Sequence, residues 1–457
     1  MSDIVPHIDE VGLKDSADTR INPGTEDKQD IQITNQGTET VAPPLGTKML
    51  GWLQSIWTAL TGVLITKPIQ NLDATGRLRV SELTTLIDLK QTVDNIPLFY
   101  DQELNGAATA VHSTLNAEVV MSVTNNGDYA IRQTKMRFNY QTGKSYLILE
   151  TFDSMEVQTD VTKRVGYFNS NDVAPFDSDK DGFWFESSDQ IYTVVEKAGT
   201  VTSKTAQSDW NVDKLDGTGP SGITADWSLG QILIMDMLWL GKAGIRWYIE
   251  IDNMPILFHV DNYANTIKEV YISNPNHSVR YEIRSTGGAG SMSQVCSTVA
   301  IEGSRNKTGI IKGHNVGTTK LDANTKDTTY AAMGIRLKSA YLTAEVDLLV
   351  FSLLGTTADS FLWELRSNPT VAGTFTYVDE PNSALQIARG ATANTITGGD
   401  IIDNGYVYQK ASERAVIENA LRLGTKINGT RDEFVLMVTP LSNGLDVYTS
   451  FTGREIL

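Results

Sequence analysis

Three aspartates with calcium-loop spacing are the first candidates for chemistry in this sequence. The segment Asp177-Ser-Asp-Lys-Asp-Gly182 places carboxylates at positions 1, 3 and 5 of the pattern and the turn glycine at position 6. Position 12 is Ser188 instead of a bidentate glutamate, and the flanking residues are typical of strands. Two interpretations stay open: an acidic β-turn, or a structural calcium site formed by Asp177, Asp179 and Asp181. No other cofactor is expected.

A glycine-rich segment is the second candidate. Gly217-Thr-Gly-Pro-Ser-Gly222 spells G-x-G-x-x-G, a pattern that binds dinucleotides between a strand and a helix. The residues before this segment are polar, and those after it make a poor helix start. We therefore predict a tight turn with positive φ angles around Leu215, which glycine adopts without strain.

The histidines, cysteine and carboxylates give no catalytic residue. No two of the five histidines have metal-ligand spacing, and His259 is expected to be a partly buried, hydrogen-bonded side chain. Cys296 is the only cysteine, so an intrachain disulfide and a multi-cysteine zinc site are excluded, and its apolar surroundings predict a core residue. The many carboxylates keep a glycoside-cleaving pair open as an enzymatic alternative.

The charge balance bears on the choice of partner. Asp and Glu number 55 against 38 Lys and Arg, a formal net charge of -17. Such a surface repels phosphate backbones, so no nucleic-acid partner is expected. The start of the chain lacks the pattern of a secretory signal, and the apolar stretch from Leu50 to Ile65 is too polar for a bilayer span, so no membrane insertion is expected.

One helical repeat stands near the N-terminus. Five large apolar residues are spaced 3, 4, 3 and 4 apart, which is the seam of a coiled coil: Leu50, Leu53, Trp57, Leu60 and Leu64. Three interpretations stay open: packing on its own domain, self-association in a bundle, or lying on a membrane surface. We take self-association as the working hypothesis and expect residues 46–100 to be a helical oligomerisation and linker segment, with a second short helix over Ser81–Lys90. Residues 1–45, rich in Pro and Gly, predict an extended docking arm.

The rest of the chain has the texture of strands. Runs such as Ser145–Glu150 and Ile245–Ile251 alternate apolar with polar residues between Gly, Asn and Asp turns. Helices long enough for parallel crossovers are missing, and only Ser412–Leu423 is expected to be helical. We therefore predict a mainly β fold of antiparallel β-sandwich or jelly-roll domains. The polar span Gly303–Thr328 suggests a β-sandwich domain at 101–300 and a second β-rich domain at 301–457.

A resemblance rests on the segment from Trp210 to Ile283. It contains Trp210, the stretch Leu215-Asp-Gly-Thr-Gly-Pro-Ser-Gly222, Leu238-Trp-Leu-Gly, Ile245-Arg-Trp247, His259, Asn262, Val270-Tyr271, Pro275 and Arg280-Tyr-Glu-Ile283. This pattern resembles a module widespread in structural proteins of tailed phages. In the arm, Asn22-Pro-Gly-Thr-Glu-Asp-Lys-Gln-Asp30 is similar to a stretch near the start of phage fibre, neck and baseplate subunits. The sequence departs from the module at Lys242-Ala243 and Asn276-His277.

The resemblance implies a structural, non-enzymatic component of the virion. We expect a fibre- or spike-like subunit on the tail or neck, which docks on other virion proteins through residues 1–45 and forms a homotrimer. Its β-sandwich domains would serve assembly or host attachment, with a carbohydrate or protein of the host surface as partner. A head fibre or capsid decoration protein is one alternative, and a carbohydrate-cleaving tailspike enzyme is another. From the residues themselves, we expect Trp210, Trp239 and Trp247 to be buried in a sandwich core.

Overall fold

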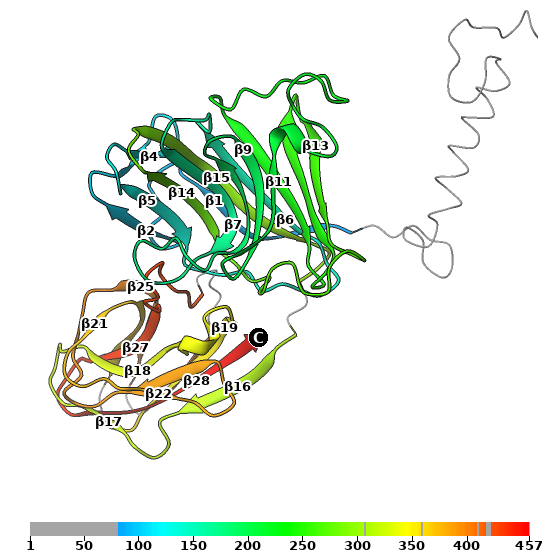
Figure 1. Ribbon diagram of the computed structural model, residues 1–457. Helices are drawn as coiled ribbons and strands as arrows, with labels where there is room; N and C mark the ends of the chain where they lie inside the picture. Colours follow the sequence, from blue (N-terminus) through cyan, green and yellow to red (C-terminus); the bar gives the residue numbers. More distant parts are fainter. Residues whose placement is uncertain (1–80, 306–307, 358–359, 409–410, 417–421, 457) are drawn as a thin grey trace, which may run out of the picture. The chain divides into compact units, whose positions relative to one another are not determined.

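Antiparallel β-strands make up almost all of the regular structure (Figure 1). The computed structural model describes residues 81–305, 308–357, 360–408, 411–416 and 422–456. Within these ranges, the helical elements are two short 3-10 turns, η1 (Gln207–Asp209) and η2 (Ser339–Tyr341). Every strand pairing in them is antiparallel. The prediction of a mainly β, antiparallel fold is confirmed.

Two sheets between residues 83 and 302 form what we call the first sandwich. The eight-stranded sheet has the order β13 (Met254–Asn262), β12 (Gly244–Ile251), β11 (Gln231–Leu238), β6 (Tyr146–Asp153), β15 (Gly290–Glu302), β4 (Glu118–Val123) and β3 (Thr109–Ser113), and β1 (Leu83–Lys90) also pairs with β15. The seven-stranded sheet has the order β10 (Thr200–Ala206), β9 (Ile191–Lys197), β8 (Asp181–Ser187), β7 (Val161–Asn169), β14 (Val279–Ser285), β5 (Tyr129–Thr134) and β2 (Tyr100–Asn105).

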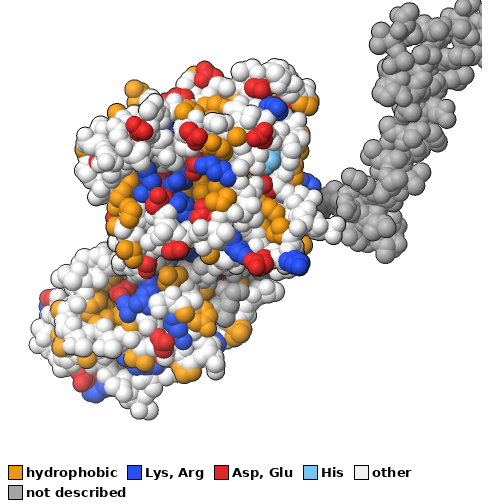
Figure 2. Space-filling model, in the orientation of Figure 1, with side chains coloured by type: hydrophobic (Ala, Val, Ile, Leu, Met, Phe, Trp, Pro, Cys, Tyr) orange, Lys and Arg blue, Asp and Glu red, His pale blue; other side chains and the backbone are white. Residues whose placement is uncertain are grey.

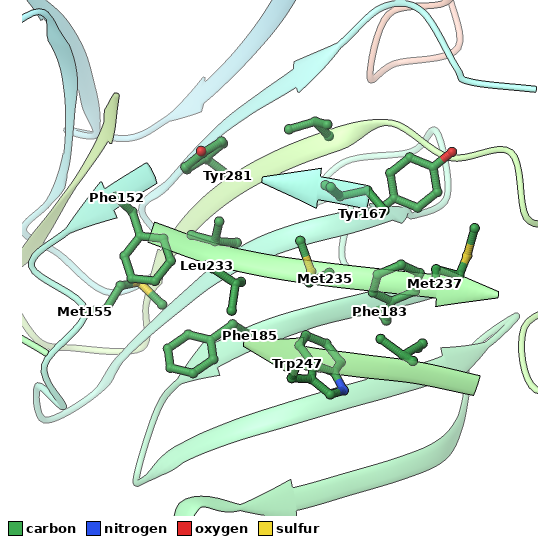
Figure 3. Packing of buried hydrophobic residues seen from close by; sticks show 14 of the residues in the cluster. Phe152, Met155, Tyr167, Phe183, Phe185, Leu233, Met235, Met237, Trp247 and Tyr281 are labelled. Carbon is green, nitrogen blue, oxygen red and sulfur yellow. The ribbon is translucent and has the colours of Figure 1, made fainter. Parts of the chain in front are cut away.

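The core of the first sandwich lies between the facing sides of these sheets. Successive residues of a strand point to opposite faces, and β6 accordingly alternates buried and half-buried positions along its whole length. Figure 3 shows side chains of both sheets meeting: Leu233 and Trp247 from the eight-stranded sheet, Phe183 and Phe185 from the seven-stranded one. All four are fully buried. Burial of such aromatic surface is the main stabilising contribution in a chain without disulfides.

Residues 310–456 form a second sandwich with its own hydrophobic core. Its five-stranded sheet has the order β16 (Ile310–Asn315), β28 (Leu445–Ile456), β19 (Glu345–Gly355) and β26 (Ser412–Val416), with β17 (Leu321–Ala323) also on β28. Its six-stranded sheet has the order β22 (Tyr377–Asp379), β23 (Leu385–Arg389), β18 (Tyr330–Leu337), β27 (Glu433–Pro440), β20 (Phe361–Ser367) and β25 (Asp400–Val407). A separate two-stranded sheet pairs β21 (Thr370–Val371) with β24 (Ile396–Thr397).

Two predicted helices are strands in the structure. Leu83–Lys90 is β1, because Ile87 and Leu89, two residues apart, both enter the core beside β15. Ser412–Val416 is β26, paired with β19, while residues 417–421 lie outside the described ranges. In Leu83–Lys90 burial beside β15 overrides the local helical pattern, and in Ser412–Val416, where Ala415 alone is buried, pairing with β19 does so.

The docking arm (1–45) and the seam residues of the oligomerisation segment lie outside the described residues, so these predictions are not tested: Leu50, Leu53, Trp57, Leu60 and Leu64. Glu82–Leu457 is one compact unit that contains both sandwiches. The predicted division into domains at residue 300 therefore stays a prediction. No helix among the described residues is long and apolar enough to cross a membrane.

Candidate functional site

The tryptophans of the Trp210–Ile283 segment form part of the core. Trp210 follows η1 and is 3% exposed, with its ring centroid 4.2 Å from that of Phe258 on β13. Trp247 on β12 is fully buried and meets Phe183 edge-on at 5.8 Å. Trp239 is only partly buried and donates from Nε1 to the carbonyl of Ile272 at 3.3 Å. The predicted burial is confirmed for Trp210 and Trp247.

Asn211, the residue after Trp210, pairs with the outer edge of the eight-stranded sheet. Strand β13 stands at that edge, where backbone groups lack a neighbouring strand. The side chain of Asn211 donates from Nδ2 to the carbonyl of Val260 and accepts the Val260 N–H through Oδ1, both at 2.9 Å. The backbone N–H of Asp213 donates to the carbonyl of Phe258 at 3.0 Å. This segment therefore covers part of the edge of β13.

Asp213 organises the glycine-rich loop. Its Oδ1 accepts the N–H of Leu215 at 2.9 Å, and its Oδ2 accepts the N–H of Ser221 at 2.7 Å. Burial raises the pKa of this carboxyl, but these backbone donors outweigh the effect and lower it. A Cβ atom at Gly219 would lie 2.1 Å from Oδ1, so glycine is needed for the close approach. The carboxylate of Asp213 thus satisfies backbone N–H groups on both sides of the loop.

The backbone of this loop agrees with the predicted turn. Leu215, Gly217 and Gly222 have φ angles of 51°, 85° and 68°. Asp216 and Thr224 form an isolated antiparallel bridge, and no helix begins among the residues between the loop and β11. The prediction of a tight turn is confirmed, and the dinucleotide interpretation lacks the helix that it requires.

His259 belongs to a buried polar cluster on β12 and β13. It is 4% exposed, and its Nδ1 receives the backbone N–H of Asn211 at 3.4 Å. Its Nε2 lies 3.6 Å from Oδ1 of Asp261, beyond hydrogen-bond distance, and has no hydrogen bond within the described structure. The other oxygen of Asp261 accepts the indole N–H of Trp247 at 2.8 Å. His259 is thus more buried than predicted, and the predicted hydrogen bonding holds for Nδ1 but not for Nε2.

Arginine and glutamate side chains form a buried network on the outer face of the seven-stranded sheet. Glu282 and Arg280, both fully buried, alternate along β14 with core residues and are joined by a hydrogen bond of 2.9 Å. Arg164 on β7 lies 2.6 Å from Glu282 and 2.8 Å from Glu186. Figure 2 shows basic and acidic side chains intermingled on the face of the first sandwich that it presents. Because the charges alternate in sign, they neutralise one another.

Electrostatics of this network favour the ionised carboxylates. Burial raises the pKa of Glu282, but Arg284, Arg280 and Arg164 outweigh it and hold that pKa well below the ordinary value. The same competition between burial and Arg164 lowers the pKa of Glu186 to about 2. Truncating one member would therefore leave a buried charge without compensation.

The segment with calcium-loop spacing covers this network. The carbonyl of Phe176 accepts hydrogen bonds from Arg280 and Arg284, at 2.9 and 3.0 Å. Asp177 pairs with Arg164 at 2.8 Å and with Lys180 at 2.8 Å. The arginines therefore hold the loop on the sheet.

The other two aspartates of the loop have separate surroundings. Asp181 is buried, and its two oxygens accept backbone N–H groups of Ser273 and Asn274 at 2.8 and 3.0 Å; His277 Nε2 lies 3.3 Å away. Burial raises its pKa, but the nearby His277 and the backbone N–H donors outweigh burial and lower the pKa to about 2. Asp179 is exposed. No three His, Cys, Asp or Glu side chains group as metal ligands in the described part of the chain.

Cys296 and two clefts are further candidate sites in the described structure. Cys296 is half-buried on β15, opposite Lys90, so the expected core position is only partly right. An apolar cleft lies along β1, lined partly by Leu86, Phe99 and Met136. A cleft of mixed polar and apolar character lies at the ends of β11, β12 and β13, beside Ser145 at the start of β6. Its residues come from three strands and their flanking turns, so no local motif could have predicted it.

Comparison with models of known protein families gave no match, and comparison with curated proteins gave none. Solved structures similar to the chain include a β-glucanase of Bacillus licheniformis: 9% identity, 50% of this chain and 100% of that one, TM-score 0.31. A protein of unknown function from Shewanella oneidensis shares 12% identity over 59% of this chain and 100% of its own, with TM-score 0.34. A Bacillus subtilis protein of unknown function with a galectin-like fold has 8% identity, coverages of 50% and 100%, and TM-score 0.33. At these values the similarities carry no conclusion about function.

Proposed function

We propose that this chain is a structural, non-enzymatic subunit of a tailed-phage virion. It docks on other virion proteins through residues 1–45, self-associates as a homotrimer, and uses its β-sandwiches for assembly or host attachment. A fibre- or spike-like position on the tail or neck is the leading version, and a head fibre or capsid decoration protein is the variant of the same plan. The proposal rests first on the resemblance of the Trp210–Ile283 segment and of the arm to phage structural proteins.

One observation supports a structural role for the Trp210–Ile283 segment. Its distinctive side chains act on the rest of the first sandwich: Trp210 and Trp247 fill the core, and Asn211 covers a sheet edge. Arg280 and Glu282 hold a covering loop. None of these groups is both accessible and arranged for proton transfer or nucleophilic attack. A module whose characteristic residues serve folding is what a structural subunit requires.

The test measures assembly in solution by light scattering. The full chain is compared with its Leu53→Glu/Leu60→Glu variant and with a chain beginning at Glu82, which retains β1 in its sheet. The proposal expects a trimer for the full chain and monomers for the other two. A Leu83→Glu variant is the matched control, because Leu83 is an exposed leucine outside the proposed seam. If the seam variant keeps the mass of the full chain, the seam is not the assembly element.

A second measurement addresses the particle. Antibodies against the Glu82–Leu457 unit, carrying gold, are mixed with purified phage particles whose genome encodes the chain. Labelling at one place on the tail, neck or head supports the proposal and selects its version. Particles that neither bind the antibody nor contain the chain by mass spectrometry would overturn it.

A further inference from the structure

A cleft with both polar and apolar lining on the outer face of the eight-stranded sheet has features of a binding site. It has a volume of about 330 Å³ and lies at the ends of β11, β12 and β13, beside Ser145 at the start of β6. Asp236 on β11 and Arg246 on β12 stand directly opposite each other in the sheet. Their chain neighbours Met235, Met237 and Trp247 point into the core, so Asp236 and Arg246 point out of it.

Glycine allows the close approach of β12 and β13 beside this cleft. Gly244, at the start of β12, faces Asn262 of β13. A Cβ atom at this position would lie 2.0 Å from the carbonyl oxygen of Asp261, so the two strands could not approach as they do with any other residue. The spacing of the two strands on this side of the cleft therefore requires glycine.

The cleft combines hydrogen-bond donors and acceptors. Asp236 accepts a hydrogen bond from the hydroxyl of Ser145. Its other oxygen lies 3.7 Å from Nη1 of Arg246, and the Arg246 side chain is 62% exposed, so the guanidinium keeps donors free for a ligand. The amide of Asn262 adds both a donor and an acceptor at the rim. Leu238 and Val260 contribute apolar surface between these groups.

This mixture selects among ligand classes. An anionic ligand would meet the carboxylate of Asp236, which already partly balances the single cation Arg246. A purely apolar ligand would leave the polar groups without hydrogen bonds. The hydroxyls of a sugar both donate and accept, and its C–H surfaces can contact Leu238 and Val260. The volume lies at the lower end of the range for small-molecule sites, about 300 to 1,000 Å³, which suits one sugar ring.

We propose that this cleft, formed by Asp236, Arg246, Ser145 and Asn262, reversibly binds one neutral sugar unit of a surface carbohydrate. The inference rests on the attachment role in the proposed function and gives that role a place and a ligand class. Binding breaks no covalent bond. The carboxylate of Asp236 accepts from sugar hydroxyls, and the guanidinium of Arg246 donates to them.

The full-length chain is titrated with glucose, galactose, mannose and N-acetylglucosamine, each as the free monosaccharide. Binding of each sugar is measured by saturation-transfer NMR. We expect at least one of these sugars to bind with 1:1 stoichiometry per chain. Asp236→Asn and Arg246→Met are each expected to weaken it roughly 10-fold or more, because hydrogen bonds to charged groups are stronger than those between neutral groups. Arg246 is exposed, so its substitution leaves folding intact even if Asp236→Asn does not.

Two controls locate the site. Asp252→Asn makes the same change of charge at the exposed turn between β12 and β13, and it should bind like the unmodified chain. Tyr406→Ser removes an exposed aromatic side chain of the second sandwich, 71% exposed, and it should also leave binding unchanged. The inference is overturned if none of the four sugars binds, if Arg246→Met binds normally, or if Tyr406→Ser abolishes binding. Gold labelling of the particle is independent of these results, so failure here leaves the virion assignment standing.

Discussion

Asn211 and Val260 pair through two hydrogen bonds of 2.9 Å, one in each direction, so a single side chain takes the place of a neighbouring strand. Edge strands leave their backbone groups open to unwanted pairing with other chains. A side chain that occupies one donor and one acceptor near the C-terminal end of β13 interrupts such pairing. Asn211 directly follows Trp210, so the core tryptophan and the residue that pairs with the sheet edge are neighbours in the sequence.

Replacement of Asn211 by Ala should therefore loosen the edge of β13. Because both bonds are at the surface, we expect a loss of about 1–2 kcal/mol in the free energy of unfolding, measured with urea. Asn211→Asp keeps an acceptor for the Val260 N–H but places a carboxylate oxygen against the Val260 carbonyl, so it should also destabilise the chain. Hydrogen exchange of the Val260 amide should accelerate in Asn211→Ala. An unchanged exchange rate would show that the pairing does not protect this edge.

Gly219→Ala should act through Asp213. The added methyl would lie 2.1 Å from Oδ1 of Asp213, so the carboxylate must move and release the N–H groups of Leu215 and Ser221. We expect a destabilisation of about 1–3 kcal/mol in urea unfolding. In the Asp213→Ala background the same substitution should have little effect, because the obstructing carboxylate is gone. A double-mutant cycle in which the two effects simply add would contradict this mechanism.

Glu282→Gln should strongly destabilise the first sandwich at neutral pH. Removal of the charge leaves Arg280 and Arg164 buried without their common partner, which costs about 3–5 kcal/mol. Asp179→Asn, an exposed change in the loop that covers the network, is the matched control and should stay within about 0.5 kcal/mol. Urea unfolding at pH 7 compares the three chains.

The same network predicts sensitivity to acid. The folded-state pKa values of Glu282 and Glu186 are depressed, so their stabilising contribution is present above the unfolded value of about 4.3 and is lost as pH falls through the folded values. For Glu186 that window runs from about 4.3 down to about 2. The free energy of unfolding should fall between pH 4.5 and 2.5, with a smaller slope in Glu282→Gln than in the unmodified chain. Equal slopes would contradict a depressed pKa at Glu282.

The fold class was predictable because its signal is repeated along the chain. Each alternating run, such as Tyr146–Asp153, independently gives a strand with one buried face. Leu83–Lys90 was misread because a short apolar run fits a helix as well as a strand. Only its pairing with β15 decides between them. Local sequence does not contain that information.

The site residues were harder to predict, because they meet through long-range contacts. Asp177 and Asp181 look like partners in one loop, yet Asp177 pairs with Arg164 on β7 and Asp181 with backbone N–H groups beyond residue 270. Asp236 and Arg246 become neighbours only because β11 and β12 pair in the sheet. The glycine-rich turn was predicted correctly because positive φ angles are a property of the local chain.

Glu150 is a buried carboxyl without a hydrogen-bond partner in the described structure, and this predicts an effect of pH on stability. It lies on β6 between Leu233 and Ser297, is fully buried, and neither of its oxygens has a hydrogen bond within the described structure. Burial raises its pKa well above the ordinary value. The folded chain therefore keeps a proton there that the unfolded chain releases above about pH 4.3.

The raised pKa of Glu150 determines whether its contribution to stability rises or falls with pH. A raised folded-state pKa gives a contribution that is fully present below the unfolded value and is lost as pH rises toward the folded one. Glu150→Gln removes this titration while keeping the shape, so the variant should match the unmodified chain near pH 4 and become more stable than it as pH rises. The difference should grow by up to about 1.4 kcal/mol per pH unit in urea unfolding between pH 4.5 and 7. Acid loss in the Arg164–Glu282 network is common to both chains and cancels in the comparison. A difference that stays constant over this range would show that Glu150 is ionised in the folded chain, with a cation or water supplying the partner that its surroundings lack.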